Sequence, residues 1–456
     1  MKSVSKIIFV FCFLFLILPE FLGIELSASL PLITAARILI LILLGVTLAL
    51  VVKNRSFRIL SDKKIWLVAG VYFVLRTASN LYYVTTYSSA VNNIFKMIAE
   101  EIVLFVLIPV FLENEEDRSS ALKAVVYGCG VISAFGIAES LTGFRIADYL
   151  YTVEREMLND HYIRLGILRA TVTFGLSNFF AFYLTLMAPL ILFLWKITGQ
   201  KRYMLIALLN FFALMFTGCR GNILVYFFLL AVYPFFMGKK DERLMYFKRL
   251  GVCCCIVVML ILIQRAVSPK LKYYYDGTAK SLLNVVGFDF DLSEGAPEGV
   301  NGYGTNEKTG TASRLAQFSG IGYVMSIDPL FGLGAGAQNR QEIKYYWNGK
   351  WINSGTYDVG YVAAVCDEGI IGAAGYLFLY IGMAVFYAIA AYKEKDERQK
   401  KYLNTFLLVN VLYLLCLFFA TNRMSMYFFL NAIGLLFCAP FKSITLNGRS
   451  RQEEQT

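Results

Sequence analysis

The chain is organised around its longest polar segment, residues 312–372, which read ASRLAQFSGIGYVMSIDPLFGLGAGAQNRQEIKYYWNGKWINSGTYDVGYVAAVCDEGIIG. This is the longest part of the sequence that is neither an apolar run nor a short connector, and its end continues directly into an apolar run. Long connections of this kind in a compact protein are usually functional. The segment therefore predicts one large loop that the helices around it present.

The composition is that of a membrane protein. Hydrophobic residues make up 58% of the 456 residues and charged residues only 16%, and the mean hydropathy is +0.59, far more apolar than the soluble average. The net charge is +11, but the basic residues lie in short clusters between apolar runs, which argues against nucleic-acid binding. Most of the cysteines lie inside apolar runs without metal-ligand spacing. We therefore expect neither a metal nor a cofactor.

Apolar runs long enough to cross a bilayer, which takes about 20 residues, recur about twelve times. They lie near residues 5–23, 30–52, 64–84, 92–112, 121–142, 171–195, 203–218, 221–237, 248–266, 359–391, 402–420 and 424–440. The sequence therefore predicts an all-α, polytopic integral membrane protein with about twelve transmembrane helices and one large extracytoplasmic loop.

Lys and Arg in the short connectors predict the orientation. They gather in the connectors 53–64, 196–202, 239–249 and 393–401 and are absent near 20–29 and 85–91. Both termini are therefore expected in the cytoplasm. Residues 1–266 would hold nine helices with an outer loop at 143–170, residues 267–358 the large extracytoplasmic loop, residues 359–441 the last three helices, and residues 442–456 a cytoplasmic tail.

The large loop has two parts with different patterns. Residues 287–311 are rich in Gly, Asn and acidic residues and lack periodicity, which is typical of a mobile lid. From Arg314, apolar residues recur at helical spacing, which predicts a short helix on the outer membrane interface, and Pro329 would end it.

Four arginines are predicted at the outer face. They are Arg169, Arg220, Arg314 and Arg423. A charged side chain at this depth is costly unless it pairs or faces water, and clustered guanidinium groups match a diphosphate in geometry and charge. The alternative is that each arginine reaches to the phosphates of the lipid headgroups.

Three motifs in order carry a resemblance to a known family. They are FTGCRGN (216–222), RLAQFSGIGYVMSIDPLFGLGAG (314–336) and DVGYVAAVCDEGIIG (358–372). Over roughly residues 165–392 the chain resembles the O-antigen ligase and polymerase family, which combines an arginine turn, an Arg-led loop helix, a Pro-Leu-Phe-Gly-x-Gly turn and a polar-led span. The resemblance implies an all-helical glycosyltransferase of a bacterial cytoplasmic membrane. Its donor is an oligosaccharide on a polyprenyl diphosphate, moved to an acceptor at the outer leaflet without nucleotide or metal.

One departure from the family pattern bears on the subtype. Ligases carry a histidine at the head of the last motif, where this chain has Asp358, and the only histidine, His161, lies in the other outer loop. The difference favours a polymerase over a ligase. Arg220 and Arg314 would stabilise the leaving diphosphate and Asp358 would orient or deprotonate the acceptor hydroxyl. Asp358 could instead be only a helix N-cap.

Further expectations complete the proposed site. Arg169 and Arg423 would contact the substrate, and Tyr346, Trp347 and Trp351 could stack on sugar rings or belong to an interfacial aromatic belt. Expected partners are the polyprenyl-diphosphate-linked oligosaccharide, the bilayer and other membrane proteins of polysaccharide assembly. A flippase for the same lipid-linked sugars is the rival, but a transporter would show two related halves, and the long loop occurs once.

Two weaker patterns favour ordinary loops. Asp289 and Asp291 resemble a metal-binding pair, but they lie in the predicted outer loop and are expected to be solvated. The glycine-rich residues 332–338 follow a proline turn rather than a buried strand, which predicts a turn and not a dinucleotide site.

Inside the predicted spans, two ionisable residues are expected to meet. Arg76 and Glu100 each lie about eight residues from the outer end of neighbouring spans, so they should lie at similar depth. We predict an ion pair between them, which would have a structural role unless it lines a water-filled pathway.

Overall fold

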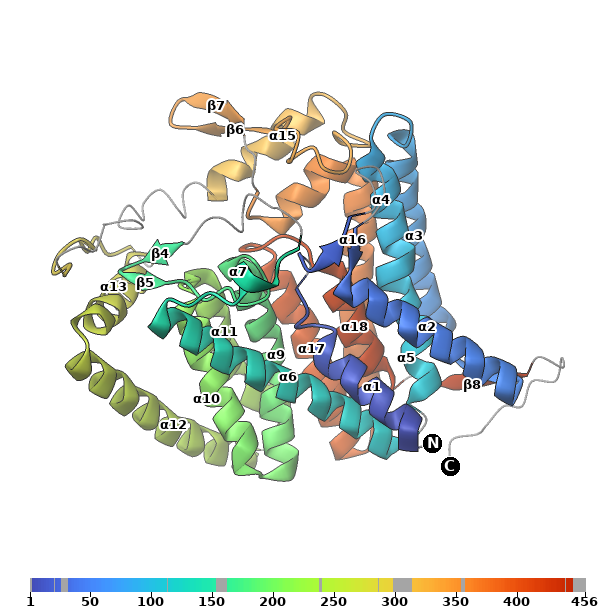
Figure 1. Cartoon of the computed structure of the whole chain (residues 1–456), viewed down its shortest axis with the longest axis horizontal. Helices are drawn as coiled ribbons and strands as arrows, with labels where there is room; N and C mark the ends of the chain where they lie inside the picture. Colours follow the sequence, from blue (N-terminus) through green and yellow to red (C-terminus); the bar gives the residue numbers. More distant parts are fainter. Residues whose placement is uncertain are drawn as a thin grey trace. The chain divides into compact units, whose positions relative to one another are not determined.

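The computed structural model describes residues 2–19, 21–25, 32–112, 114–152, 162–237, 240–285, 287–297, 314–353, 357–438 and 440–445. The chain divides into two compact units, and Figure 1 shows their helices and strands coloured along the sequence. The first unit is discontinuous and consists of Met1–Gly128 and Gln317–Thr456. The second unit, Cys129–Ala316, lies between these two parts in the sequence.

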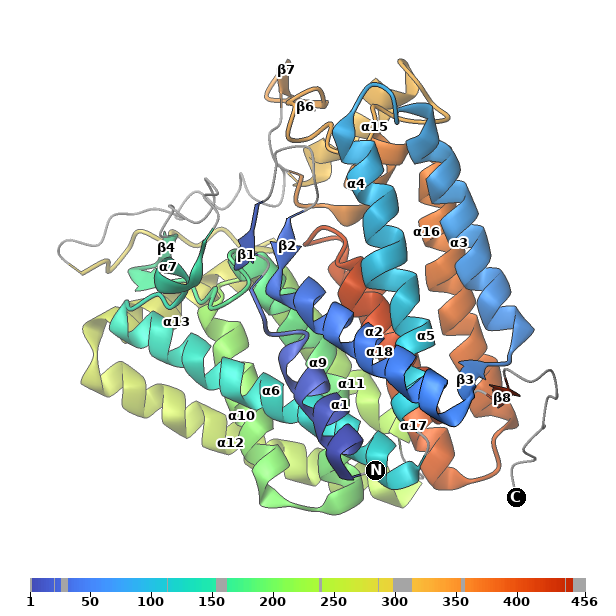
Figure 2. The ribbon, with the colours of Figure 1, turned by 45° about the vertical axis from the view of Figure 1, so that its right-hand side comes forward.

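Helices make up most of the first unit. They are α1 (Lys2–Leu14), α2 (Ala35–Asn54), α3 (Lys63–Tyr82), α4 (Ser88–Lys96), the π-helix η1 (Met97–Ile102), α5 (Val103–Phe111), the first half of α6 (Glu115–Thr142), α15 (Ser319–Met325), α16 (Gly360–Lys393), α17 (Glu397–Cys416) and α18 (Met424–Leu435). Helices α3 and α16 lie side by side, although they are far apart in the sequence (Figure 2). Carboxylates of Asp62 and Asp396 cap α3 and α17 by accepting backbone N–H bonds of the first turn.

Three short antiparallel ladders belong to the same unit. They are β1 (Gly23–Ile24) with β2 (Ile33–Thr34), β3 (Ser56–Leu60) with β8 (Phe441–Thr445), and the hairpin β6 (Lys344–Trp347) with β7 (Lys350–Asn353). The β3–β8 ladder pairs Ser56 with Thr445 and Leu60 with Phe441. It therefore joins the basic connector after α2 to the segment that follows the last helix.

The other helices of the described residues belong to the second unit. They are the second half of α6, α7 (Ala147–Leu150), α9 (Ser177–Thr198), α10 (Lys201–Phe216), α11 (Arg220–Met237), α12 (Lys240–Val267) and α13 (Pro269–Val285), with the ladder β4 (Ile163–Arg164) and β5 (Ile167–Leu168). Helix α9 is buried along most of its length and forms the core of the unit. It ends at Gly199, a glycine with φ 65°, the usual way in which a helix stops.

The predicted helical membrane protein is confirmed at a coarse level. Six helices in the described residues are long and apolar enough to cross a bilayer, namely α2, α6, α9, α11, Glu242–Val267 within α12, and α16. Helix α1 has 13 residues and α18 has 12, fewer than the about 20 that a spanning helix needs. The count of twelve spans, the orientation and the cytoplasmic termini stay predictions.

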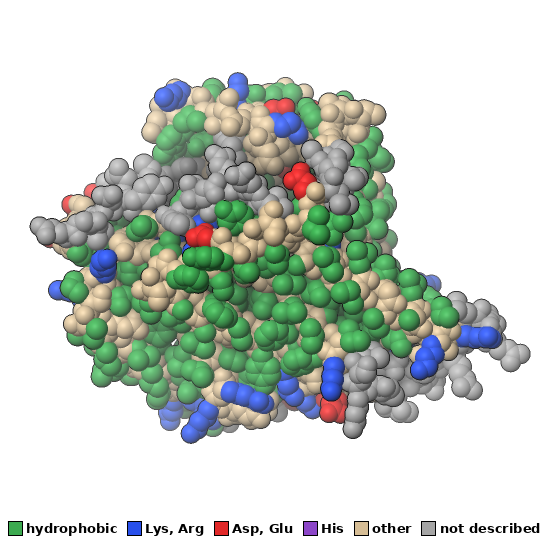
Figure 3. All heavy atoms as spheres, in the orientation of Figure 1, with side chains coloured by type: hydrophobic (Ala, Val, Ile, Leu, Met, Phe, Trp, Pro, Cys, Tyr) green, Lys and Arg blue, Asp and Glu red, His purple; other side chains and the backbone are tan. Residues whose placement is uncertain are grey.

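Large apolar side chains face outward on the candidate spans. Leu41, Leu48 and Val52 of α2 and Val252 and Met259 of α12 are each more than half exposed, and hydrophobic side chains cover a large part of the face in Figure 3. Soluble proteins rarely expose apolar patches of this extent. A lipid environment removes this cost, as expected of a membrane protein.

The predicted large loop contains regular structure that the sequence pattern did not predict. Helix α13 lies within it, and residues 287–297 are bound to α13 rather than left as a free lid. The Asn284 side chain accepts from the Phe290 backbone N–H and donates to the Phe290 carbonyl. Tyr273 donates to the Leu292 carbonyl (2.7 Å). Lys280 forms an ion pair with Glu294 (2.8 Å). Residues 298–311 of the predicted lid lie outside the described residues.

Two predictions of secondary structure are confirmed in this loop, namely the helix before Pro329 and the glycine-rich turn. Residues 314–317 and α15 are helical and end before Pro329. The glycine-rich residues 332–338 form turns in which Gly332, Gly334 and Gly336 have φ between 72° and 83°. Such backbone conformations favour glycine, so these glycines serve a turn and not a dinucleotide fingerprint.

Candidate functional site

The turn between α10 and α11 is held by arginines. Arg220 is the first residue of α11 and follows Gly218, whose φ of 65° lets the chain reverse. The Arg164 guanidinium donates to the Gly218 carbonyl (2.8 Å), and Arg169 Nε donates to the Thr217 carbonyl (2.7 Å). Three arginines thus belong to one turn, which we call the arginine turn (Arg164, Arg169 and residues 217–220).

The charge of Arg169 is not matched by a carboxylate. Besides the Thr217 carbonyl, its guanidinium reaches the Asn178 amide oxygen (3.3 Å) and the Cys219 sulfur (3.1 Å), and in the described part of the chain it forms no ion pair. Neutral acceptors orient a guanidinium without cancelling its charge. Arg169 therefore supplies positive charge beside the N-terminus of α11, where backbone N–H groups also favour an anion.

Neighbouring elements hold Arg164 and Arg169 in place. The turn of the β4–β5 hairpin inserts Leu165 against Gly277 of α13, where a Cβ would lie 2.8 Å from the Leu165 methyl groups. The buried Tyr274 of α13 donates to the Met215 carbonyl. Burial raises the pKa of the Tyr274 hydroxyl, and the charges of Arg164 and Arg169 act in the opposite direction. Helix α13, which the sequence pattern did not predict, is thus a support of the arginine turn.

The predicted site residues fall into two groups. Arg169 and Arg220 meet at the arginine turn of the second unit, and Arg314 is a half-buried residue at its end. Asp358 and Arg423 belong to the first unit, as do the predicted aromatic residues. The joining of these groups into one site stays a prediction, and His161 lies outside the described residues.

Asp358 is not the cap of α16. The N-cap residue is Val359, and no side chain caps the helix. The first helical N–H, that of Gly360, instead donates to the Leu417 carbonyl (2.7 Å). The Asp358 backbone N–H is bonded by the Gln317 side chain (3.1 Å). The N-cap alternative is therefore wrong, and the predicted role toward an acceptor hydroxyl remains untested.

Arg423 lies at the start of α18. It is the N-cap residue of α18, and its backbone N–H donates to the Tyr413 hydroxyl (3.0 Å). The neighbouring Asn422 accepts a hydrogen bond from Tyr380 (2.7 Å). Buried tyrosines therefore fix the backbone on which the Arg423 side chain stands.

The predicted aromatic cluster is a β-hairpin. Tyr346 pairs with Trp351 across the strands with ring centres 5.6 Å apart, and Trp347 pairs with Lys350. Asn348 and Gly349 form the connecting turn with φ of 50° and 81°, as in hairpins with an Asn-Gly turn. Tyr346 and Trp351 are about half exposed, so their rings are accessible for stacking.

Two of the quoted motifs interlock in the first unit. Helix α16 is broken at Gly369, which has φ 61° and ψ −164°. The N–H groups of Ile370 and Ile371 beyond the break are bonded by the Pro329 and Leu330 carbonyls (3.0 and 3.2 Å), and the Cys366 carbonyl before it accepts from Leu333 (2.9 Å). The Pro-Leu-Phe-Gly-x-Gly turn thus satisfies the backbone groups that the break exposes.

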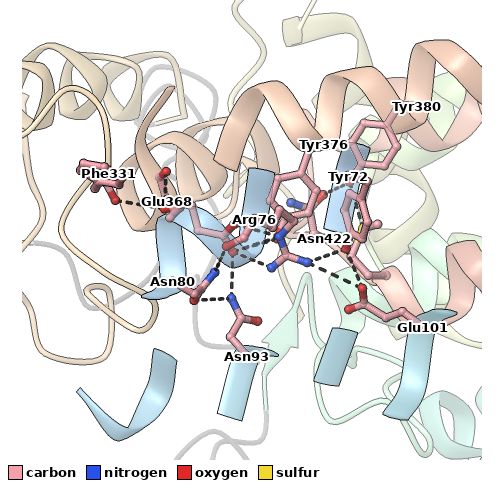
Figure 4. A network of polar contacts seen from close by, with 12 residues as sticks. Tyr72, Arg76, Asn80, Asn93, Glu101, Phe331, Glu368, Tyr376, Tyr380 and Asn422 are labelled. Carbon is pink, nitrogen blue, oxygen red and sulfur yellow. Dashed lines mark hydrogen bonds and ion pairs between the residues drawn. The ribbon is translucent and has the colours of Figure 1, made fainter. Parts of the chain in front are cut away.

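A buried charge network lies at the break (Figure 4). Arg76 of α3 donates to both Glu368 carboxylate oxygens, through Nη2 to Oε1 (2.5 Å) and through Nε to Oε2 (2.8 Å). Its Nη1 lies 3.7 Å from Glu101 Oε2, and its guanidinium lies 4.2 Å from the centre of the Tyr376 ring. Arg76, Glu101 and Glu368 are each at most 4% exposed.

Polar side chains complete the network. Tyr72 donates to Glu101 (2.6 Å), Asn93 donates to Glu368 Oε1 (2.8 Å), and Ser79 donates to the Glu368 backbone carbonyl (2.7 Å). Buried charges are stable only when they are paired and hydrogen-bonded in this way. The network therefore ties α3 and η1 to the broken part of α16.

The predicted ion pair between Arg76 and Glu100 is wrong. Glu100 pairs with Arg37 of α2, and Arg76 faces Glu101 and Glu368. The physical reason is the π-helix η1 at Met97–Ile102: it inserts one extra residue into a turn and rotates the helix face. Glu101 consequently takes the position that a regular α-helix would give to Glu100.

Sequence reasoning missed Glu368, although a signal for it was present. The apolar run 359–391 is longer than the about 20 residues that cross a bilayer, and an acidic pair followed by Gly369 interrupts it. An ionisable residue beside a glycine in an overlong run indicates a broken helix with a polar site at the break.

A scan of the chain against models of known protein families gives no match, and a search of the curated proteins gives no significant match.

Proposed function

We propose that the chain is a membrane glycosyltransferase that polymerises polyprenyl-diphosphate-linked oligosaccharide repeats at the outer leaflet of a bacterial cytoplasmic membrane. The observation that carries the proposal is the arginine turn. Arg169 is oriented by neutral acceptors and Arg220 begins α11, an arrangement suited to a diphosphate. The sequence resemblance supports the same donor.

The chemistry needs a stabilised leaving group and a prepared acceptor. When the sugar C–O bond to the diphosphate breaks, negative charge grows on the diphosphate oxygens. Preorganised cations at that position lower the barrier, and guanidinium groups can bind two oxygens at once. Arg169, Arg220 and Arg314 would bind the diphosphate, and Asp358 would accept the proton of the acceptor hydroxyl.

The proposal is tested by replacing Arg220 with Ala and, separately, with Lys in the native host. The length of the surface polysaccharide is measured together with the protein level in the membrane. We expect short or absent chains for Arg220→Ala and partial recovery for Arg220→Lys, because lysine keeps the charge but not the bidentate geometry.

The matched control is Arg202→Ala, since Arg202 is an exposed arginine at the start of α10 that donates to Gln200 (2.7 Å) and faces the Tyr203 ring. Chains of normal length in Arg220→Ala, at normal protein level, would contradict the proposal. Accumulation of the finished chain on its lipid carrier would favour a ligase.

A flippase for the same lipid-linked sugars is the second candidate, and the broken helix α16 favours it. Discontinuous helices with ionisable residues at the break mark substrate or ion sites in many transporters. A strain deficient in the polymer separates the two functions. Single repeat units at the cell surface indicate a missing polymerase, whereas repeat units retained inside indicate a missing flippase.

A further inference from the structure

A groove of about 340 Å³ lies in the first unit. It is lined by the aromatic rings of Tyr83, Tyr87 and Tyr323, by Ile327 and Leu333, and by the polar side chains of Gln341, Glu342 and Lys344. The volume falls within the range of small-ligand sites, which combine apolar walls with a few polar groups. We refer to it as the tyrosine groove.

The aromatic wall of the tyrosine groove is preformed. The Tyr83 and Tyr87 rings stack with centres 5.7 Å apart and pack on Gly334, where a Cβ would lie 2.9 Å from Tyr87 Cδ2. The Arg340 guanidinium covers Tyr87 at 3.6 Å from the ring centre and donates to the Leu333 carbonyl (2.7 Å). A rigid wall lowers the entropy lost when a ligand binds.

The lining of the groove also includes hydrogen-bonding groups and a third aromatic ring, that of Tyr323. Tyr323 of α15 contacts Trp351 (5.7 Å between ring centres) and lies 5.8 Å from the Lys344 ammonium. In the described residues Lys344 has no carboxylate partner. Gln341 is exposed and has φ 56°, a strained conformation for a non-glycine residue that is typical of ligand sites.

This combination selects a particular ligand chemistry. The faces of a pyranose ring carry C–H groups that pack on aromatic rings, whereas its edges carry hydroxyls. Gln341 can donate and accept and Lys344 can donate, so these side chains match the hydroxyl edge of a sugar, whereas the Glu342 carboxylate is paired with Arg340 (2.8 Å). A lipid acyl chain would leave Gln341 and Lys344 without partners, which is unfavourable.

We propose that the tyrosine groove binds a sugar residue of the glycan, with Tyr323 and Tyr83 stacking on the ring and Gln341 and Lys344 bonding its hydroxyls. The site rests on the proposed glycosyltransferase function for the identity of its ligand. It recognises the sugar itself and not the diphosphate, which is assigned to the arginine turn.

The test uses the full chain in lipid nanodiscs and, as the probe, soluble oligosaccharides released from the host's surface polysaccharide by mild acid. Affinity is measured by calorimetry or by saturation-transfer NMR. We expect Tyr323→Ala to weaken binding about tenfold through loss of stacking, and Tyr323→Phe to stay close to the native chain.

A second variant separates binding from folding. Gln341→Gly relieves the positive φ, so its unfolding temperature should not fall, while loss of the amide should weaken binding about threefold. Absence of binding by the native chain, or unchanged affinity in both Tyr323→Ala and Gln341→Gly, would overturn the proposal.

Failure of this site is distinguishable from failure of the proposed function. Arg220→Ala is expected to bind the diphosphate-free probe normally and to lose polymer. If Arg220→Ala instead made polymer of normal length while Tyr323→Ala lost the probe, the sugar site would hold and the proposed catalytic role would fail.

Discussion

Two regions of the molecule hold arginines in opposite ways. In the first unit, Arg76 is bonded by Glu368 and faces Glu101, so carboxylates compensate its charge inside the fold. In the second unit, Arg169 is bonded by a carbonyl, an amide and a sulfur, so its orientation is fixed and its charge remains. The comparison teaches that the acceptor, and not burial alone, decides whether an arginine serves the fold or an anionic ligand.

The largest expected effect comes from removing the compensated arginine. Arg76→Ala leaves Glu101 and Glu368 buried without their cation, and breaking a buried pair in this way costs about 3–5 kcal/mol. We expect low membrane levels and a strongly reduced unfolding temperature in detergent. Glu368→Gln, which retains hydrogen bonding, should cost less, because Glu101 still faces Arg76.

A stable Arg76→Ala chain that no longer makes polymer would contradict the claim that an arginine paired with carboxylates serves only the fold. The buried network would then have a direct functional role, as expected of a transport pathway, rather than a structural one.

The second effect concerns the break in α16 next to that network. Gly369→Ala should lower the unfolding free energy by about 1–3 kcal/mol, because its φ of 61° with ψ of −164° is accessible almost only to glycine. A Cβ there would also collide with the Leu330 carbonyl. Thermal unfolding of the purified chain measures the loss.

Gly45→Ala in the exposed helix α2 is the matched control, because a Cβ at Gly45 meets no atom within 4 Å. It should raise stability by about 0.5–1 kcal/mol through the better helix propensity of alanine. Equal effects at both glycines would show that the interlock of the two motifs contributes nothing.

The third expected effect concerns Arg169, whose charge no carboxylate compensates in the described residues. Inorganic pyrophosphate at about ten times its dissociation constant should stabilise the native chain by about 1.4 kcal/mol. Arg169→Gln should lose this stabilisation, and Arg202→Gln should keep it. The measurement is the unfolding temperature with and without pyrophosphate at constant ionic strength, and equal stabilisation of all three chains would refute the anion site.

The smallest expected effect is a loss of acid-dependent stability at Asp291, in the loop 287–297. Asp291 accepts bonds from the Ser293 hydroxyl (2.7 Å) and backbone N–H (2.8 Å), and these bonds lower the pKa of its carboxyl. A lowered folded-state pKa gives stability that is present above the ordinary pKa and is lost as the pH falls through the folded value.

Asp291→Asn should therefore abolish that acid dependence in the loop 287–297. Protection of this loop from limited proteolysis, followed from pH 6 down to about pH 3, measures it. An unchanged pH profile in the variant would exclude Asp291 as the titrating group.

Local patterns in the sequence predicted the helices, while partners distant in the chain could not be predicted. Apolar runs mark most helices because burial in lipid demands length and hydrophobicity. Helix α13 lacks such a run, and its buried face is made of tyrosines that pack within the second unit. The sequence did contain a signal for the β6–β7 hairpin, because Asn348 and Gly349 lie between two aromatic runs. The sequence prediction considered these aromatic residues only for stacking and did not predict the hairpin.

The types of residue at the candidate site could be predicted from the sequence, but not all of their partners. Sequence reasoning placed Arg220 correctly at a turn and predicted a buried partner for Arg76. It chose Glu100 from its depth in the predicted span, and this count does not include the extra residue that the π-helix η1 inserts. No local pattern reports that Glu368 packs on α3, since 292 positions separate it from Arg76.

That separation has a consequence for how the protein is made. Because the second unit is inserted within the first, α3 leaves the ribosome long before the helix that carries Glu368. At about 5–20 residues per second, the 292 intervening positions take roughly 15 to 60 s to synthesise. During that interval Glu101, which follows only 25 residues after Arg76, is the one of the two carboxylates facing Arg76 that has already been synthesised.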